Sequence, residues 1–200
     1  MIDKFAKFIV QKLICNFEIE KDEQNLYHYA LFILISKILF FTFTLALGLL
    51  LNVAIESLIF FIAFTALRQY AGGFHAKTET RCEVLSFCSL FGCILIIKLA
   101  KIYDMLIPML CTALFFSAII FIFAPIDSPA KPLSVKEIKY FRKVTWIISL
   151  CVIIAIIVSF CFKLNIVFAP CCVSIILEGV LVGVGQIKKL CTKKRASSDI

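Results

Sequence analysis

The sequence has few of the features that build metal sites and disulfide frameworks. It contains only two histidines, His28 and His75, and its ten cysteines form no Cys-x-x-Cys pair. Zinc ligands cluster at short, regular spacings, so this pattern argues against a metal site. A disulfide framework is also disfavoured, because most of the cysteines lie in apolar runs, where a thiol packs as a small hydrophobe. We therefore expect neither a metal nor another cofactor.

Charge is also scarce. Charged residues make up 17% of the chain against 62% hydrophobic residues, and the mean hydropathy is +1.03. This is not the composition of a soluble globular protein, and apolar runs of about 18 residues or more are typical of membrane spans. The net charge of +8 is therefore interpreted through membrane topology, not as affinity for nucleic acid. The first 26 residues do not resemble a secretory signal, because no uninterrupted apolar stretch follows a basic start.

The apolar runs predict an all-α fold, a polytopic membrane helical bundle that forms one domain over residues 1–200. The bundle occupies residues 27–187 and is followed by a basic tail at 188–200. The six predicted spans are residues 29–47, 53–67, 84–99, 106–123, 144–162 and 166–187.

An amphipathic segment at residues 1–26 precedes the bundle. Ile2, Phe5 and Ile9 recur there at helical spacing, with lysines on another face. A basic amphipathic helix of this kind lies in the headgroup plane of an anionic membrane. We therefore expect an interfacial helix before the first span.

The basic residues gather on one side of the predicted spans. All but four of the 21 lysines and arginines fall on the side of the two termini. By the positive-inside rule, this side faces the cytoplasm. The loop at residues 68–83 lies on the same side and is predicted to be cytoplasmic.

Two ionisable residues fall at similar depths inside the predicted spans. An isolated charge is costly there, so we predict an ion pair between Lys37 and Glu178, with snorkelling of Lys37 to the interface as the alternative. Next to Glu178, Gly179 and Gly183 have the GxxxG spacing that suits close helix packing, within one subunit or between two.

The polar stretch 68–83 separates two long apolar runs. Thr80 and Glu83 have capping-box spacing, which predicts Thr80 as the N-cap of the following helix. Cys82 then falls in the first turn, where unpaired N–H groups and the helix dipole favour the thiolate. Cys82 is thus the cysteine best placed to react.

A possible base lies nearby in His75. Gly72 and Gly73 interrupt the helix, so a loop can fold His75 back to within hydrogen-bond reach of Cys82. The glycine N–H groups are also available to an oxyanion. From residue types alone, a juxtamembrane loop with a solvated histidine and an incidental cysteine stays an alternative.

A second loop follows the fourth span. Residues 124–133 hold three prolines in a stretch of eight, which predicts a stiff, non-helical connection. Ser134 and Glu137 have capping-box spacing, so a helix is predicted to begin at about Val135. Its basic face is either ordinary positive-inside flanking or a docking surface for an acidic peptide. That face comprises Lys136, Lys139, Arg142 and Lys143.

The run at residues 68–82, RQYAGGFHAKTETRC, resembles the signature of the AgrB family of quorum-sensing peptide processors. That signature is an arginine, an aromatic-Ala-Gly-Gly-aromatic-His-Ala run, and a cysteine seven residues after the histidine. The resemblance extends over nearly the whole chain, through the basic N-terminal segment, the apolar spans, the proline loop and the lysine-rich tail.

The resemblance implies a membrane cysteine endopeptidase of the bacterial cell membrane. It implies an AgrD-like propeptide as substrate, removal of the acidic tail of that peptide, and closure of a thiolactone ring. Cys82 would be the nucleophile and His75 the general base, both on the cytoplasmic side, in a protein that works as a homodimer. Arg68 and Gly73 fall in the matching motif and would shape the site or bind substrate. From the residues themselves, we add Gly72 of the glycine pair and the basic residues Lys131, Lys136 and Lys139 as candidates for the same role.

Two other functions stay open. A small transporter would use Lys37 and Glu178 as its key residues and would survive loss of Cys82. A non-catalytic membrane scaffold would bind a peptide through its basic loops without cleaving it.

Overall fold

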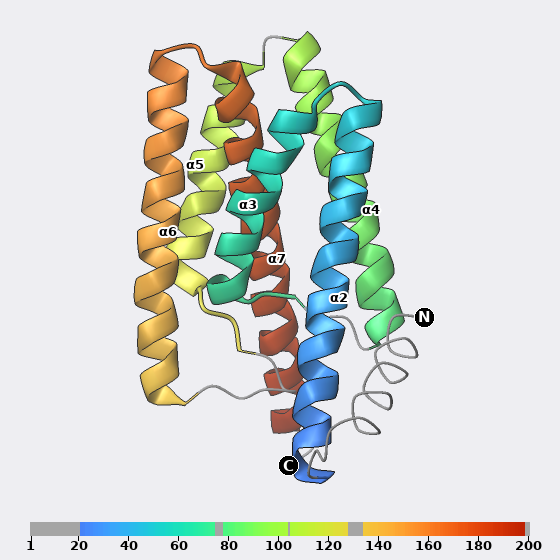
Figure 1. The fold of residues 1–200 in the computed structure, drawn as a ribbon. Helices are drawn as coiled ribbons and strands as arrows, with labels where there is room; N and C mark the ends of the chain where they lie inside the picture. The colour runs from blue at the N-terminus through green and yellow to red at the C-terminus, as the bar shows by residue number, and fades with distance from the viewer. Residues whose placement is uncertain (1–20, 75–77, 104, 128–133, 199–200) are drawn as a thin grey trace.

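The computed structural model describes residues 21–74, 78–103, 105–127 and 134–198. This part of the chain is all-helical, with six helices and no β-strand (Figure 1). The helices are α2 (Lys21–Leu50), α3 (Ala54–Ala71), α4 (Glu79–Ile102), α5 (Leu106–Phe123), α6 (Val135–Cys161) and α7 (Asn165–Ser198). The predicted helical bundle is confirmed.

All six helices contain a stretch of 18 to 27 residues that is long and apolar enough to cross a membrane. The predicted spans are therefore confirmed, but several helices extend beyond them. The third predicted span, residues 84–99, lies within the longer α4. The last predicted span, residues 166–187, lies within α7, which continues to Ser198. The apolar runs predict only the part of a helix that crosses the membrane, whereas the backbone hydrogen bonds of these helices continue into the polar residues that follow. The backbone of the predicted tail is thus part of α7 through Ser198, and residues 1–20 of the predicted interfacial helix lie outside the described residues.

Helix α7 runs through the middle of the bundle, with the other helices around it (Figure 1). In its most apolar stretch, 61% of the residues are buried inside the protein, against 6% to 28% for the other five helices. Packing between helices in a membrane relies on close approach of small residues, and α7 is rich in them. The buried small residues of α7 include Ala169, Cys171, Cys172 and Ser174.

The GxxxG glycines of α7 face α5 of the same chain. A Cβ added to Gly179 would lie 2.6 Å from Cβ of Phe116, and one added to Gly183 would lie 3.8 Å from Cγ2 of Ile119. The predicted close packing is present within the subunit. Gly179 is thus covered by α5, and Gly183, which is half-buried, faces the same helix.

At one end of the bundle, two lysines near the end of α4 bind the turn between α2 and α3 and the first turn of α3. Lys98 donates a hydrogen bond to the Leu51 carbonyl at 2.9 Å, and Lys101 donates to Oε1 of Glu56 at 2.6 Å. Glu56 lies in the first turn of α3 and Lys101 in the last turn of α4, where each charge suits the helix dipole.

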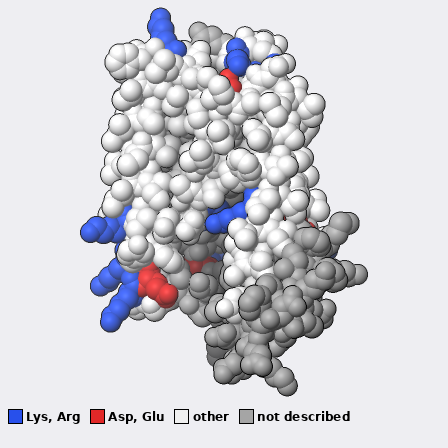
Figure 2. Space-filling view, in the orientation of Figure 1, with Lys and Arg blue, Asp and Glu red and all other residues white. Residues whose placement is uncertain are grey.

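The opposite end holds the start of α2, α4 and α6 and the end of α3, α5 and α7 (Figure 1). We call it the basic end because Lys and Arg side chains gather there, over the start of α6 in Figure 2. Its exposed or half-buried basic residues include Arg68, Arg81, Lys136, Lys139, Arg142, Lys143, Lys188 and Lys189.

The predicted capping box at the start of α6 is confirmed. The Glu137 amide donates to Oγ of Ser134 at 3.3 Å, and the Ser134 amide donates to Oε2 of Glu137 at 2.8 Å. Both side chains thus satisfy amides that the helix leaves unpaired. Helix α6 begins at Val135, as the sequence predicted.

We expect Ser134→Ala to loosen the first turn of α6. Loss of an N-cap costs about 1 kcal/mol, which corresponds to roughly a fivefold increase in local opening. Hydrogen exchange of the amides next to Ser134 should speed up by about this factor. Ser134→Asp keeps an oxygen acceptor and is the matched control; equal exchange in both variants would contradict the capping role.

Candidate active site

The loop between α3 and α4 begins with a glycine pair that ends α3. Gly72 has a φ of 68° and Gly73 a φ of 123°, values that side chains with a Cβ rarely adopt. Helix α3 therefore ends at Ala71. The predicted break in the helix is confirmed.

The described start of this loop, residues 72–74, is held by backbone hydrogen bonds on two sides. The Ile126 amide, from the connection between α5 and α6, donates to the Ala71 carbonyl at 2.9 Å. The Phe74 amide donates to the Leu181 carbonyl of α7 at 2.9 Å. Gly73 is buried between them. Residues 72–74 thus lie between α7 and the connection after α5.

Arg68, in the last turn of α3, closes this loop from within. Its guanidinium donates one hydrogen bond to the Gly72 carbonyl and another, from Nη2, to the Phe74 carbonyl at 2.8 Å. A planar guanidinium presents several donors in a fixed fork, which suits two neighbouring carbonyls. Arg68 therefore shapes the loop directly.

The predicted ion pair between Lys37 and Glu178 is wrong. Lys37 is exposed on α2, whereas Glu178 is fully buried on α7, with Oε1 at 3.8 Å from Nη1 of Arg68. Equal depth in the bilayer did not decide the partner, because the two side chains point to different surroundings. Burial of an unpaired charge costs several kcal/mol, so the carboxylate lies where an arginine is available.

Cys82 is the fourth residue of α4, at the end of its first turn. The prediction that Thr80 caps this helix is wrong: the N-cap is Thr78, in extended conformation and without a side-chain capping bond. The Cys82 amide donates to the Thr78 carbonyl at 3.1 Å, the first bond of the helix, so α4 begins before the capping-box pattern. The Cys82 thiol is free and half-buried at the basic end.

The structure brings some of the predicted site residues together and leaves others untested. Arg68, Gly72 and Gly73 form one cluster with the loop. His75 and Lys131 lie outside the described residues. Lys136 and Lys139 are exposed near the start of α6, at the same end of the bundle.

Aromatic rings contact the basic helix segments at this end of the bundle, near the start of α6 and near the end of α7. The rings of Tyr70 in α3 and Phe141 in α6 are 5.9 Å apart, in an edge-to-face arrangement. On the other side of the loop, Nζ of Lys188 lies 4.9 Å from the ring centre of Phe74. Both contacts place basic helix segments beside the candidate site.

Sequence reasoning missed two residues that hold the loop and gave a third residue the wrong partner. Ile126 and Leu181 act through backbone groups, which no residue type reveals. Glu178 was noticed as a buried acid but given the wrong partner. The signal that points to Arg68 is its position in the last turn before the glycine pair, because a cation there faces the free carbonyls of the helix end.

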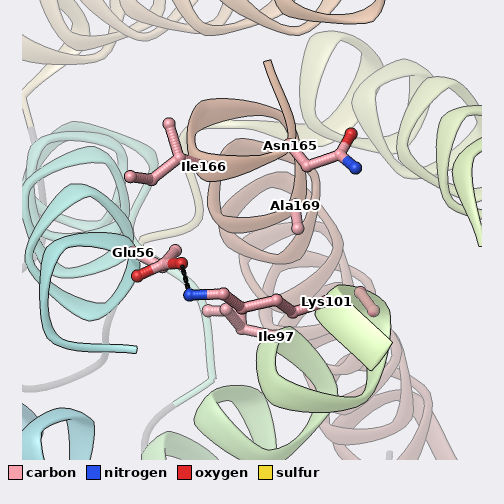
Figure 3. Close-up of a pocket in the computed structure, with 7 residues that line it drawn as sticks. Glu56, Ile97, Lys101, Asn165, Ile166 and Ala169 are labelled. Carbon is pink, nitrogen blue, oxygen red and sulfur yellow. Dashed lines mark hydrogen bonds and ion pairs between the residues drawn. The ribbon is translucent and has the colours of Figure 1, made fainter. Parts of the chain in front are cut away.

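A cavity of about 140 Å³ lies at the opposite end of the bundle and is a separate feature (Figure 3). It is lined by residues that include Glu56, Lys101 and Asn165, and the ion pair of Glu56 with Lys101 crosses it. Lys101 is 19 residues beyond Cys82 along α4, a rise of about 28 Å. This cavity is therefore not part of the candidate active site.

The fold and the site define a class of membrane protein. It is a polytopic helical bundle in which a glycine loop and a free cysteine lie at the basic end. The family model for accessory gene regulator B, AgrB, matches residues 6–182, and the chain belongs to this family of the accessory gene regulator quorum-sensing system.

Individual relatives agree with this assignment. The chain is 28% identical over 144 residues to AgrB-like protein 2 of Clostridium perfringens (strain 13 / Type A), covering 70% of this chain and 67% of that protein. It is 33% identical over 97 residues to accessory gene regulator protein B of Staphylococcus intermedius, covering 48% of this chain and 50% of that protein. No solved structure matches the chain.

We expect Gly73→Ala to destabilise the protein. Alanine would be strained at this φ by about 1 to 3 kcal/mol, and its Cβ would contact the Arg68 guanidinium and lie 3.1 Å from the Leu181 carbonyl. Thermal unfolding in detergent should show a lower midpoint. Gly92→Ala is the control, because nothing lies within 4 Å of its added Cβ, and it should be neutral or stabilising by up to about 1 kcal/mol. Equal midpoints would contradict the close packing of the loop.

Proposed function

We propose that this protein is a membrane cysteine endopeptidase that matures an AgrD-like propeptide. Cys82 is the nucleophile and His75 the general base. The enzyme removes the acidic C-terminal tail of the peptide and promotes closure of a thiolactone ring in the remaining segment. Membership of the AgrB family supports the substrate class.

One structural observation supports the nucleophile most directly. Cys82 is a free, half-buried thiol in the first turn of α4, the helix that follows the glycine pair in the chain. The N-terminal end of a helix has a positive partial charge, which stabilises a thiolate. By contrast, Cys93, Cys171 and Cys172 are buried in the apolar interior.

The first half of the reaction breaks the peptide. His75 takes the proton from the Cys82 thiol, and the thiolate attacks the carbonyl carbon before the tail. The tetrahedral intermediate collapses as the C–N bond breaks, and His75 returns the proton to the leaving amine. The peptide remains attached to Cys82 as a thioester, and the acidic tail is released.

The second half closes the ring. An internal cysteine of the peptide gives its proton to His75 and attacks the thioester carbonyl. Cys82 leaves as a thiolate and recovers the proton. Exchange of one thioester for another is nearly isoenergetic, so the acyl energy is kept if water is excluded. The close packing of residues 72–74 against α7 and the connection after α5 favours that exclusion.

The basic end suits an acidic, amphipathic substrate. Lys136 and Lys139 are exposed near the start of α6, and Lys131 precedes them in the sequence. These cations would attract an acidic tail, while the peptide leader binds the same membrane interface. We include a homodimer in the proposal, with an interface other than Gly179 and Gly183, since those glycines pack against α5.

The transporter alternative has little support in the geometry. It needs Lys37 and Glu178 to line one path, but Lys37 is exposed on α2 and Glu178 is fully buried beside Arg68. The scaffold alternative does not require the free thiol of Cys82 at the start of α4.

The test is co-expression with an AgrD-like peptide. The wild type should release the tail and yield a thiol-sensitive cyclic product, both detected by mass spectrometry. Cys82→Ala and Cys82→Ser should lower processing by about a thousandfold or more. His75→Ala should lower it by about a hundredfold to ten-thousandfold, the range for loss of a general base.

Cys88→Ala is the matched control. Cys88 is an exposed cysteine six residues further along α4, so its loss should leave processing unchanged. Processing that persists in Cys82→Ala would rule out the proposed nucleophile. Peptide binding without cleavage by the wild type would favour the scaffold.

We also expect the basic end to face the cytoplasm. In a background without native cysteines, Leu164→Cys and Lys189→Cys place one thiol at each end, at exposed positions. A membrane-impermeant maleimide should label Leu164→Cys in intact cells, but Lys189→Cys only after permeabilisation. The reverse pattern would invert the proposed orientation.

A further inference from the structure

Glu178 is the one fully buried acid of the described bundle, and neither of its carboxylate oxygens accepts a hydrogen bond there. A buried carboxylate without hydrogen bonds is costly, and such groups are retained where they hold a partner. The partner here is Arg68, whose Nη1 lies 3.8 Å from Oε1 of Glu178. The proposed chemistry at Cys82 does not use Glu178.

The rest of the Arg68 guanidinium faces the loop. It donates to the carbonyls of Gly72 and Phe74. The Phe74 carbonyl belongs to the peptide group that joins Phe74 to His75. Arg68 thus connects the carboxylate of α7 to the backbone that leads into the proposed base.

Helix α7 fixes the same loop at a second and a third point. Leu181, three residues after Glu178, accepts the Phe74 amide at 2.9 Å. Gly185, seven residues after Glu178, lies so close that an added Cβ would be 3.0 Å from the Phe74 nitrogen. Residues three and seven apart share one face of a helix. One stripe of α7 therefore fixes the amide of Phe74 directly and its carbonyl through Arg68.

We propose that Glu178 is a positioning residue for the active site, which acts through Arg68 to hold the peptide group that leads into His75. The proposal rests on the proposed function for its effect on catalysis. Its structural part, the hold on the loop, does not. Without the carboxylate, the half-buried guanidinium loses its counter-charge and its orientation toward the two carbonyls.

The test compares Glu178→Gln with the wild type. Positioning acts on the reacting geometry, so kcat for tail release should fall by about a hundredfold, with KM changed by about twofold or less. Hydrogen exchange of the Phe74 amide should speed up about tenfold. Alkylation of Cys82 should slow relative to that of Cys88 in the same helix, both followed by mass spectrometry.

Glu56→Gln is the matched control. Glu56 is also a buried acid paired with a cation, Lys101, but at the far end of the bundle. It should leave kcat and the exchange of Phe74 unchanged. If Glu178→Gln does not fold, Glu178→Asp keeps the charge with a shorter reach and should give a smaller loss of the same kind.

A double mutant tests the route of the effect. If Glu178 acts through Arg68, Glu178→Gln should add nothing to Arg68→Gln in kcat or in exchange. Additive effects would overturn the proposal, as would unchanged kcat and exchange in Glu178→Gln. If the wild type processes no peptide, the proposed function fails, while exchange of Phe74 and alkylation of Cys82 still decide the role of Glu178.

Discussion

The arrangement of the candidate site depends on the Arg68 guanidinium. It lies at the end of α3, where helix carbonyls lack partners, and it donates to the carbonyls of Gly72 and Phe74. The fully buried Glu178 of α7 is its counter-charge, with Oε1 at 3.8 Å from Nη1 of Arg68. One side chain thus holds the carbonyls that follow a helix, shapes a loop and pairs with an acid inside an apolar bundle.

That interaction explains how a non-helical loop can lie between membrane helices. Backbone groups away from water must find partners within the protein. At the start of this loop the Ala71 carbonyl accepts a hydrogen bond from the Ile126 amide, and the Phe74 amide donates to the Leu181 carbonyl. The Arg68 guanidinium donates to the carbonyls of Gly72 and Phe74. The central helix α7 supplies a close surface for this because it is lined with small residues. Scaffold and site are therefore built by the same helix.

Sequence patterns predicted the features that depend on local chemistry. The six spans, the capping box at Ser134 and the helix break at Gly72 and Gly73 are all present. The patterns failed where two local signals competed or where a partner was distant. Thr78 caps α4 through its backbone, although Thr80 has the capping-box spacing. Lys37 and Glu178 were predicted to pair because they lie at similar depth, but Glu178 pairs with Arg68 instead. Depth along a helix does not fix the face on which a side chain lies.

The sequence by itself determined the family, the number of spans and the residues proposed for the chemistry, because hydrophobic length, glycine conformation and motif spacing are properties of short segments. Only the tertiary structure decided that Glu178 meets Arg68, that Leu181 and Ile126 hold the loop, and that Gly179 packs against α5. The physical reason is that these contacts join helices far apart in the chain, and their rotation about their axes is set by packing of the whole bundle.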